Sequence, residues 1–367
     1  MTDRSEPLAQ AGEQTCACKQ CGASLVYKPG TLTLFCAYCE FFTEIEATVV
    51  QDQEIVELDF LAHAEQAQEQ ITQTSKVLRC RQCGAESVFE ETIKSAPCPY
   101  CGIALVEDDM HEERLLTPSY LQPFSVSQEE VHTHLKSWIR GLWFAPNTLR
   151  HQTAYSHELQ GVYLPYWTYD AQTETAYKGM RGDTYTVTTG SGKNRRTHTR
   201  TRWSYRSGRV SRFFDDILVP ASHTIPAQIL SKISNWNTKQ LVETDPRFYR
   251  GFTTNKYTVD LKQGYVIAKN IMDTRIDSDI RSDIGGNYQR ILSKNTVYTD
   301  IRFKLILLPV YTSSYHYRHK LYHFYVNGCT GKITGDRPYS KIKIFFAVVA
   351  GLLALAALVW YLMQEGQ

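Results

Sequence analysis

Short runs of apolar, β-branched and aromatic residues fill much of the second half of the chain, and such runs are typical of strands. Runs rich in Tyr, Thr and Val recur between residues 161 and 335, so we expect an antiparallel sheet that ends in a meander. The segments 161–169 and 307–311 each contain a proline, which predicts a position at a sheet edge or a bulge. The segments 213–220 and 256–261 predict two further strands.

Apolar residues at helical spacing predict helices in two other parts of the chain. Ser127 and Glu130 have the form of a capping box, and the helix that they would start has one apolar face: Val131, Leu135, Trp138, Ile139 and Leu142. A longer helix is predicted to end at Gly285, and its apolar face consists of Tyr265, Ala268, Met272, Ile276, Ile280 and Ile284. Four aspartates on the other side of this helix are interpreted as a solvated face: Asp273, Asp277, Asp279 and Asp283.

Residues 344–363 form a run of twenty residues without a charge. As a helix this run is about 30 Å long, which matches the hydrocarbon core of a bilayer. It therefore predicts one transmembrane helix near the C-terminus. Arg337, Lys341 and Lys343 precede the run, so the positive-inside tendency places the bulk of the chain in the cytoplasm, tethered to the inner (cytoplasmic) membrane.

Eight cysteines form two quartets with the spacing C-x2-C-x14-C-x2-C, and the second quartet lies 62 residues after the first. Four thiolates at this spacing close a tetrahedral site and leave no position for water or substrate. The pattern therefore predicts two structural Zn²⁺ ions held in two zinc ribbons. The predicted ligands are Cys18, Cys21, Cys36 and Cys39, and then Cys80, Cys83, Cys98 and Cys101.

Two other interpretations of the quartets are weaker. Disulfides need an oxidising compartment, and residues 1–15 are polar and contain no signal peptide. The segment 98–102 resembles the iron knuckle of rubredoxin, but its partner pair lies closer in sequence than is usual in that family. Cys16 and Cys329 have no place in the repeat and are interpreted as spare thiols, and His63 as a solvated helix residue.

The net charge of +2 conceals an uneven distribution. Residues 1–114 carry 20 acidic against 8 basic residues, whereas residues 115–367 carry 18 against 32. An acidic module repels a phosphate backbone, because binding to nucleic acid depends on Lys and Arg. We therefore expect the ribbons to bind a protein partner rather than nucleic acid.

A basic hairpin is predicted at residues 184–206, where two β-like runs flank a Gly-rich turn. Cationic residues alternate with other residues along its second strand, so they share one face. The candidate residues for an anionic partner are Arg195, Arg196, His198, Arg200, Arg202, Trp203, Tyr205 and Arg206. Anionic lipid, nucleic acid and the acidic half of the same chain are the alternative partners, and a solvated strand without a ligand is the plainest interpretation.

The chain resembles a family of bacterial membrane-anchored proteins with two zinc ribbons of the TFIIB type. Its members are often named "primosomal protein N′ (replication factor Y), superfamily II helicase-like". The resemblance is carried by the two ribbons and by four segments, residues 161–170, 214–219, 282–286 and 325–331. It implies partners of the SPFH-domain or phage-shock type in a membrane assembly.

A helicase requires a Walker loop and an acidic magnesium box, and the sequence contains neither. No spacing brings a Ser, Cys or His to a partner suited to catalysis. We therefore expect an α+β scaffold without enzymatic activity, and a nucleic-acid-binding accessory protein is the alternative. The predicted division is a disordered segment 1–15, ribbon 16–50, helical spacer 51–76, ribbon 77–110, α+β domain 111–340 and transmembrane helix 344–363.

Overall fold

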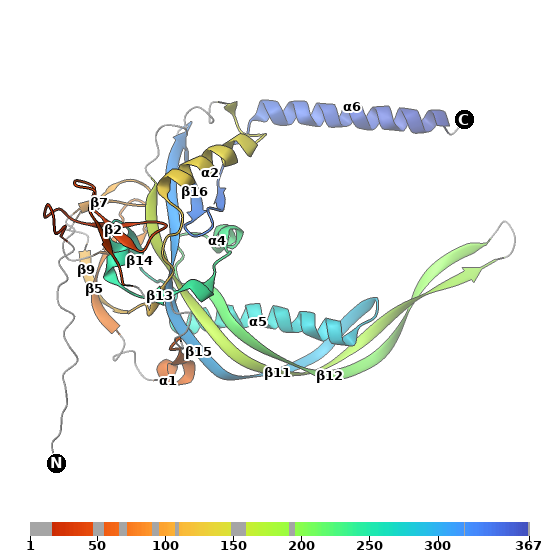
Figure 1. Ribbon diagram of the computed structural model, residues 1–367. Helices are drawn as coiled ribbons and strands as arrows, with labels where there is room; N and C mark the ends of the chain where they lie inside the picture. The colour runs from red at the N-terminus through yellow and green to blue at the C-terminus, as the bar shows by residue number, and fades with distance from the viewer. Residues whose placement is uncertain are drawn as a thin grey trace, which may run out of the picture.

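A computed structural model describes residues 17–46, 55–65, 72–89, 95–106, 110–147, 159–190, 195–318 and 320–365. It is an α+β protein in which one large mixed sheet runs through the body and continues into a long projection (Figure 1). The predicted fold class is confirmed. The segment 1–15, Cys16 and the second half of the predicted spacer helix lie outside the described residues.

The elements differ greatly in length. The strands before residue 130 are β1 (Val26–Lys28), β2 (Thr33–Phe35), β3 (Phe42–Glu44), β4 (Leu58–Asp59), β5 (Thr72–Arg79), β6 (Glu86–Phe89), β7 (Ser95–Pro97), β8 (Ala104–Val106), β9 (Met110–Leu116) and β10 (Tyr120–Leu121). The later strands are β11 (Gln160–Thr189), β12 (Arg196–Pro220), β13 (Val242–Glu243), β14 (Thr253–Asn255), β15 (Tyr288–Tyr317), β16 (Lys320–Asn327) and β17 (Ile333–Gly335). The helices are α1 (Phe60–Glu65), α2 (Gln128–Gly141), α4 (Ala227–Ile233), α5 (Leu261–Ile284) and α6 (Lys341–Glu365), with short 3-10 turns at Thr238–Gln240 and Pro246–Tyr249.

The main path of the large sheet runs β13-β10-β15-β11-β14-β6-β5-β9. β12 pairs with β11, β4 and β16 pair with β15, and β17 pairs with β16. The antiparallel succession β15-β16-β17 confirms the predicted meander. Parallel pairs join β10 to β15 and β11 to β14, so the sheet is mixed.

The long strands β11 and β15 form the centre of the sheet and pair antiparallel. Pro165 lies opposite Leu307, and Pro309 lies opposite Tyr163, so the predicted placement of both prolines at an edge or bulge is wrong. On the far side of β11 the neighbour changes from β14 to β12 at Pro165. On the far side of β15 it changes from β10 to β16 at Pro309. Proline has no N–H to donate. Pro165 and Pro309 each lie at the point where one neighbouring strand has ended and the next has not yet begun to pair.

Beyond a bulge at Asp170, β11 and β12 continue as a hairpin that projects from the body (Figure 1). We call residues 171–189 and 195–214 the arm. β15 pairs with β11 only as far as Gly182, so the outer end of the arm has two strands. The hairpin predicted at 184–206 is the tip of this longer structure, and its turn at 191–194 lies outside the described residues.

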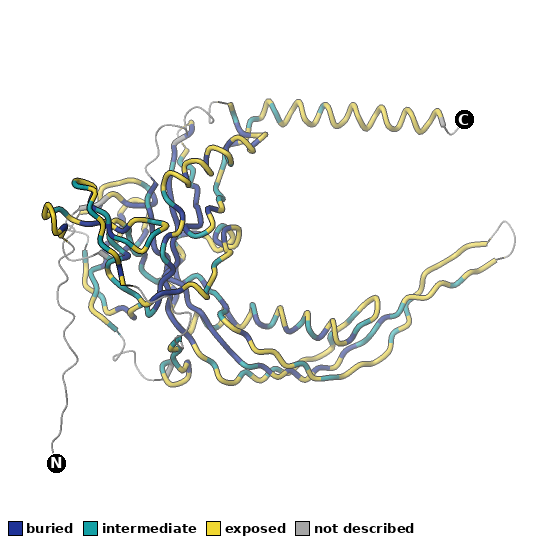
Figure 2. Tube along the Cα trace, viewed as in Figure 1, coloured by how far each residue is buried: buried dark blue, intermediate teal, exposed yellow. Residues whose placement is uncertain are grey.

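Helix α5 packs along the inner side of the arm, and its predicted apolar face is buried except for Tyr265, which is half-buried (Figure 2). Asp260 and Gln263 form a capping box at its start, and Gly285 ends it with a φ of 66°. The strand predicted at 256–261 is wrong, because β14 ends at Asn255 and the chain then turns into this cap. The capping box of α2, formed by Ser127 and Glu130, is confirmed.

The four aspartates of α5 do not form the predicted solvated face. The arm curls around the helix, so strand side chains reach these carboxylates from both flanks. The contacts are Tyr177–Asp283 (2.5 Å), Arg212–Asp279 (2.5 Å), Lys294–Asp277 (2.7 Å) and Tyr298–Asp273 (2.9 Å). They fix α5 on the arm, although pairs this exposed each contribute only about 0–1 kcal/mol.

Candidate metal centres and charged groups

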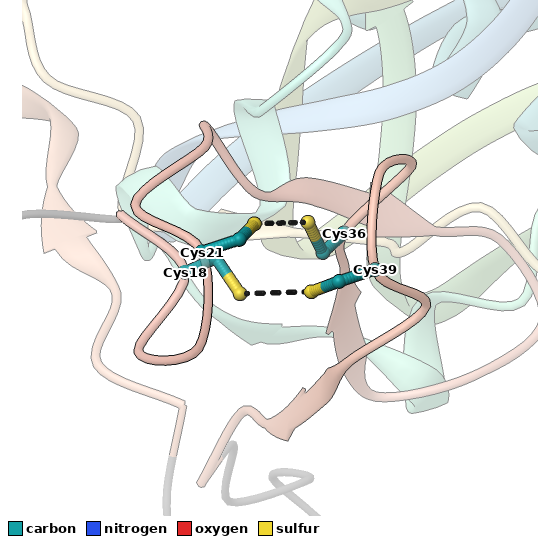
Figure 3. Close-up of side chains that lie close together, drawn as sticks. All are labelled: Cys18, Cys21, Cys36 and Cys39. Atoms are coloured by element: carbon teal, nitrogen blue, oxygen red, sulfur yellow. Dashed lines mark hydrogen bonds between the residues drawn. The ribbon is translucent and has the colours of Figure 1, made fainter.

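The first cysteine quartet lies in ribbon 1, residues 17–46, whose three strands form a separate small sheet. Its four sulfurs all lie within 4.8 Å of one another. The sulfurs of Cys18 and Cys39 are 3.4 Å apart, and those of Cys21 and Cys36 are 3.5 Å apart (Figure 3). A tetrahedral ion with bonds to sulfur of about 2.3 Å needs sulfur–sulfur distances of about 3.8 Å. The quartet therefore fits one tetrahedral metal ion.

The second quartet lies in ribbon 2, residues 72–89 and 95–106, and has the same geometry. The sulfurs of Cys80 and Cys101 are 3.5 Å apart, as are those of Cys83 and Cys98, and all four lie within 4.8 Å of one another. In each quartet two cysteines are buried and one is exposed. Both clusters are thus closed by four protein ligands, with no place for a substrate.

Each pair of cysteines lies on the same tight turn. In all four turns an N–H four residues after the first cysteine donates to the carbonyl of that cysteine, at 2.8–3.0 Å. The donor residue has a positive φ: 75° at Gly22, 58° at Glu40, 75° at Gly84 and 76° at Gly102. Three turns thus use glycine where a left-handed backbone is needed, and the turn at Glu40 adopts it without glycine.

Backbone N–H groups on these turns favour the thiolate form that binds metal. The N–H groups of Cys39 and Tyr38 lower the pKa of the Cys36 thiol to about 6. Burial raises the pKa of Cys80, but N–H groups on its turn outweigh burial and bring that pKa to about 7. The pKa is thus lowered at Cys18 and Cys36 in the first quartet and at Cys80 in the second, whereas burial and neighbouring cysteines raise the pKa of Cys21, Cys39, Cys83 and Cys98.

Cys329 lies away from both clusters, with its sulfur 3.7 Å from the carbonyl oxygen of Pro123. Burial raises the pKa of its thiol to about 12, so it is a poor nucleophile and a poor ligand. The Nδ1–H of His63 donates a 2.7 Å hydrogen bond to the carbonyl oxygen of Asp59, and the His63 ring packs against Phe303. It is thus part of the α1 contact rather than a solvated residue.

The arm presents most of the predicted anion-binding residues to solvent (Figure 2). Arg196, Arg200 and Arg202 alternate along β12 and face the same way. Within the described part of the chain no ion pair joins them to a carboxylate, although Asp183, which pairs with Arg181, lies opposite Arg202 on β11. Tyr205 is 81% exposed. Trp203 differs, because it is half-buried and the Arg290 guanidinium lies 4.2 Å from its ring.

The acidic ribbons lie at the opposite end of the molecule from the tip of the arm (Figure 1). Among the residues that the structure describes, the basic row therefore does not contact the acidic half of its own chain. Nearer the body, Arg212 of the same row does find an acidic partner, Asp279 of α5. The outer residues of the row, Arg196, Arg200 and Arg202, remain available to a partner.

Sequence reasoning missed a buried cluster of charged residues at the base of the arm. The ammonium of Lys304 on β15, whose side chain is 3% exposed, lies 2.7 Å from Glu57 and 2.7 Å from Asp216. Asp170, at the bulge of β11, accepts a 2.6 Å hydrogen bond from the N–H of Asp216. Glu57 belongs to the segment between the two ribbons and lies 247 residues from Lys304. No local pattern connects residues so far apart.

The carboxylates of this cluster share too little positive charge for all to ionise. Burial and a hydrogen bond with Glu57 raise the pKa of Asp170 to about 8. Burial lowers the pKa of Lys304, but Asp216 and Glu57 outweigh burial and raise it. Glu57, Asp170 and Asp216 are close enough together to hold a cation, and the Lys304 ammonium already fills that role.

Helix α6 is long and apolar enough to cross a membrane. Within Lys341–Gln364 the most apolar window of 18 residues has a mean hydropathy of 2.6, and this window is not buried against the rest of the chain. An unburied apolar surface of this size requires a cover, which a bilayer supplies.

The chain is similar to the uncharacterized protein YdjG of Bacillus subtilis (strain 168). The two are 24% identical over 268 residues, which cover 72% of this chain and 76% of YdjG. No family model matches the sequence, and no solved structure matches it.

Proposed function

We propose that the protein is a membrane-anchored scaffold, with two zinc-closed ribbons and an α+β body on the cytoplasmic side, that binds a protein partner. The observation that carries the proposal is the combination of two closed four-cysteine clusters with a helix whose apolar part is not buried against the body. Closed clusters stabilise a fold and do not catalyse. The chain thus offers binding surfaces at a membrane rather than a reaction centre.

Zinc is the metal that this ligand set favours, because four thiolates in a tetrahedron suit an ion without a geometric preference of its own. Iron is the rival for a site made of four thiolates. Metal analysis of the purified protein separates them. We expect two equivalents of zinc per chain. A protein that contains iron instead, or no metal, would contradict this part of the proposal.

Ribbon 1 offers the surface best suited to a protein partner. Tyr38 lies between two ligands of the first quartet and is 83% exposed, and nearby Phe42 is 46% exposed. Exposed aromatic residues on a rigid turn are typical of the centre of a protein interface. The resemblance of the sequence favours an SPFH-domain or phage-shock-type partner.

A pull-down of the full-length protein from detergent-solubilised bacterial membranes tests the scaffold. We expect a specific partner that is lost on replacement Tyr38→Ala and on treatment with a metal chelator. Phe213→Ala, at an exposed apolar residue on the arm, is the matched control and should keep the partner. Recovery of the protein in the soluble fraction after carbonate extraction would refute the membrane anchor itself.

The arm is proposed to contact anionic lipid on the same membrane. The arm and α6 leave the body toward the same side (Figure 1), which brings the basic row to the bilayer that would hold α6. Arginine is costly inside hydrocarbon, so the arm must lie along the headgroups. In the membrane-bound protein α6 therefore turns relative to the arm.

Trypsin cleaves after arginine, so the rate of cleavage within the arm measures whether its arginines are covered by a partner. In proteoliposomes of the full-length protein we expect slower cleavage between Arg195 and Arg206 with anionic lipid than with neutral lipid. The variant Arg200→Glu/Arg202→Glu should remove the difference. Equal rates on both lipids would refute the lipid contact, and protection by an added oligonucleotide instead would support the nucleic-acid alternative.

A further inference from the structure

A loop far away in sequence is attached to the first turn of α6. The Lys343 ammonium lies 3.2 Å from the carbonyl oxygen of Trp143, 2.8 Å from that of Ala145 and 2.8 Å from the amide oxygen of Asn147. The N–H of Ser340 donates to the carbonyl of Phe144 at 2.8 Å. The loop at 143–147, which follows α2, therefore lies where α6 begins (Figure 1).

The loop is folded so that its aromatic residues point away from the core. Leu142 and Ala145 are buried and hold it to the body, with 5% and 0% exposure. Between them, Trp143 is 74% exposed and Phe144 is 37% exposed. An exposed tryptophan on this loop does not stabilise the core. Its large apolar surface therefore indicates a contact with something outside the chain.

The chain just before α6 and the first turn of α6 add residues of the same kind. Tyr339 is 58% exposed and carries the Arg337 guanidinium 5.3 Å from its ring. Ile342 is 71% exposed. Arg337 and the lysines at 341 and 343 add positive charge. Two segments separated by about 200 residues thus form one aromatic and basic surface around the start of a membrane-length helix.

Aromatic and basic residues together favour the interface between water and lipid. Trp and Tyr concentrate at the headgroup level, where the ring is covered and the polar edge stays hydrated. Lys and Arg next to them are attracted by the negative surface of the cytoplasmic leaflet. We propose that Trp143, Phe144 and Tyr339 form an interfacial membrane-binding collar that sits in the headgroup layer of an anionic bilayer beside α6.

The collar rests on the proposed membrane anchor and adds a second contact to it. Its contacts involve Ser340 and Lys343, at the very start of α6. The loop therefore stays at the level where α6 enters the bilayer, even if the rest of α6 turns. The basic residues select an anionic leaflet, and the aromatic residues set the depth of the body.

Tryptophan fluorescence of the full-length protein in anionic proteoliposomes tests the collar. The background Trp360→Phe removes the tryptophan at the far end of α6. We expect spin labels at headgroup depth to quench a fraction of the emission more strongly than labels at the bilayer centre. Adding Trp143→Phe should remove this fraction, whereas Trp138→Phe, five residues earlier on α2 and partly buried against the core, should preserve it.

The outcomes separate the collar from the anchor. If the protein resists carbonate extraction and the native Trp360 is quenched by lipid while Trp143 is quenched only by aqueous iodide, the collar is refuted and the anchor stands. If Trp143 is shielded from both iodide and lipid labels, a protein covers it and the collar is equally refuted. If neither tryptophan meets lipid, the anchor fails as well.

Discussion

The two ribbons share their cysteine spacing and their turns, yet they join the body in different ways. Ribbon 1 keeps its own sheet and is attached by side-chain packing and two backbone hydrogen bonds, Tyr27 to Arg250 and Gly30 to Phe124. Ribbon 2 contributes β5 and β6 to the large sheet, where β6 pairs with β14. The duplicated sequence thus determines the metal-binding turns in both ribbons, whereas the neighbouring segments of the chain determine whether a ribbon joins the large sheet.

One duplicated residue shows the difference clearly. Tyr38 of ribbon 1 and Tyr100 of ribbon 2 occupy the same position of the repeat. Tyr38 is 83% exposed, whereas Tyr100 is 4% exposed and packs in a core with Leu164 and Tyr325. The face that ribbon 2 uses to join the body is left open on ribbon 1, which favours ribbon 1 as the site for an external partner.

The largest effect is expected from Cys80→Ser in ribbon 2. Structural zinc contributes roughly 10–16 kcal/mol to small ribbons, about as much as the whole stability of a domain. Because β5 and β6 belong to the large sheet, losing this ion should disrupt the body. We expect insoluble protein, or far-UV circular dichroism without a cooperative transition. Cys329→Ser is the control and should keep two ions per chain.

Cys36→Ser in ribbon 1 should have a smaller and more local effect. The variant should bind one ion per chain and retain the cooperative unfolding of the large sheet. It should lose stability of several kcal/mol, because Tyr27 and Leu34 no longer pack on the body. Hydrogen exchange should be fast within 17–46 and near native elsewhere. A global loss of structure equal to that of Cys80→Ser would remove the contrast between the ribbons.

Substitutions at Tyr38 and Tyr100 distinguish an effect on stability from an effect on partner binding. Tyr100→Ala deletes a buried aromatic side chain and should lower the free energy of unfolding by about 3–5 kcal/mol. Tyr38→Ala, at the equivalent exposed position, should change it by less than about 0.5 kcal/mol and should instead reduce recovery of the partner. Urea unfolding and pull-down yields, measured on both variants, check this. Equal stability losses would mean that Tyr38 also packs against the chain.

Local sequence determined much of this molecule. The cysteine turns, the capping box at Ser127, the end of α5 at Gly285 and the apolar run of α6 each follow from neighbouring residues, and the structure contains all four elements. Prediction failed where the outcome depended on distant partners. Pro165 lies inside the sheet because of where two other strands end, and no neighbour of Pro165 encodes that.

The same limit applies to charge. The aspartates of α5 have the spacing of a solvated face, and only the curvature of the arm brings Arg212 and Lys294 to them. Lys304 lies on β15 between Phe303 and the apolar run at 305–311, where it interrupts the pattern. Its partner Glu57 comes from the segment between the ribbons. The metal ligands were predictable because their geometry is local, and this cluster was not.

The cluster at Lys304 ties the segment between the ribbons to the sheet, and it should make stability depend on pH. The pKa of Asp170 is raised to about 8, so the folded state holds a proton that the unfolded chain releases above about pH 4. Stability from this proton is complete below the unfolded pKa and is lost as pH rises through about 8. The slope should approach about 1.4 kcal/mol per pH unit.

Urea unfolding of the metal-saturated protein between about pH 6.5 and 9 measures that slope. The wild-type protein should lose stability up to about pH 8 and then level off. Asp170→Asn, which keeps the shape and cannot ionise, should flatten the curve. Asp183→Asn, at a more exposed carboxylate on the arm, is the control and should leave the slope unchanged. A wild-type curve without a slope would mean that Asp170 is ionised in the folded protein.

The smallest effect concerns the one turn that departs from the repeat. Glu40 has a φ of 58° where the other three turns use glycine, and a left-handed backbone costs a residue with a side chain about 1–2 kcal/mol. Glu40→Gly should therefore stabilise ribbon 1 by about 1 kcal/mol. Gly102→Ala should destabilise ribbon 2 by a similar amount, through the backbone alone, since no neighbouring atom lies within 4 Å of the added Cβ.

Thermal unfolding and hydrogen exchange of both variants check the pair. Because ribbon 2 is continuous with the large sheet, Gly102→Ala should lower the main transition, whereas Glu40→Gly should slow only the exchange of amides in ribbon 1. A shift of the main transition by Glu40→Gly would show that ribbon 1 unfolds together with the body and not before it.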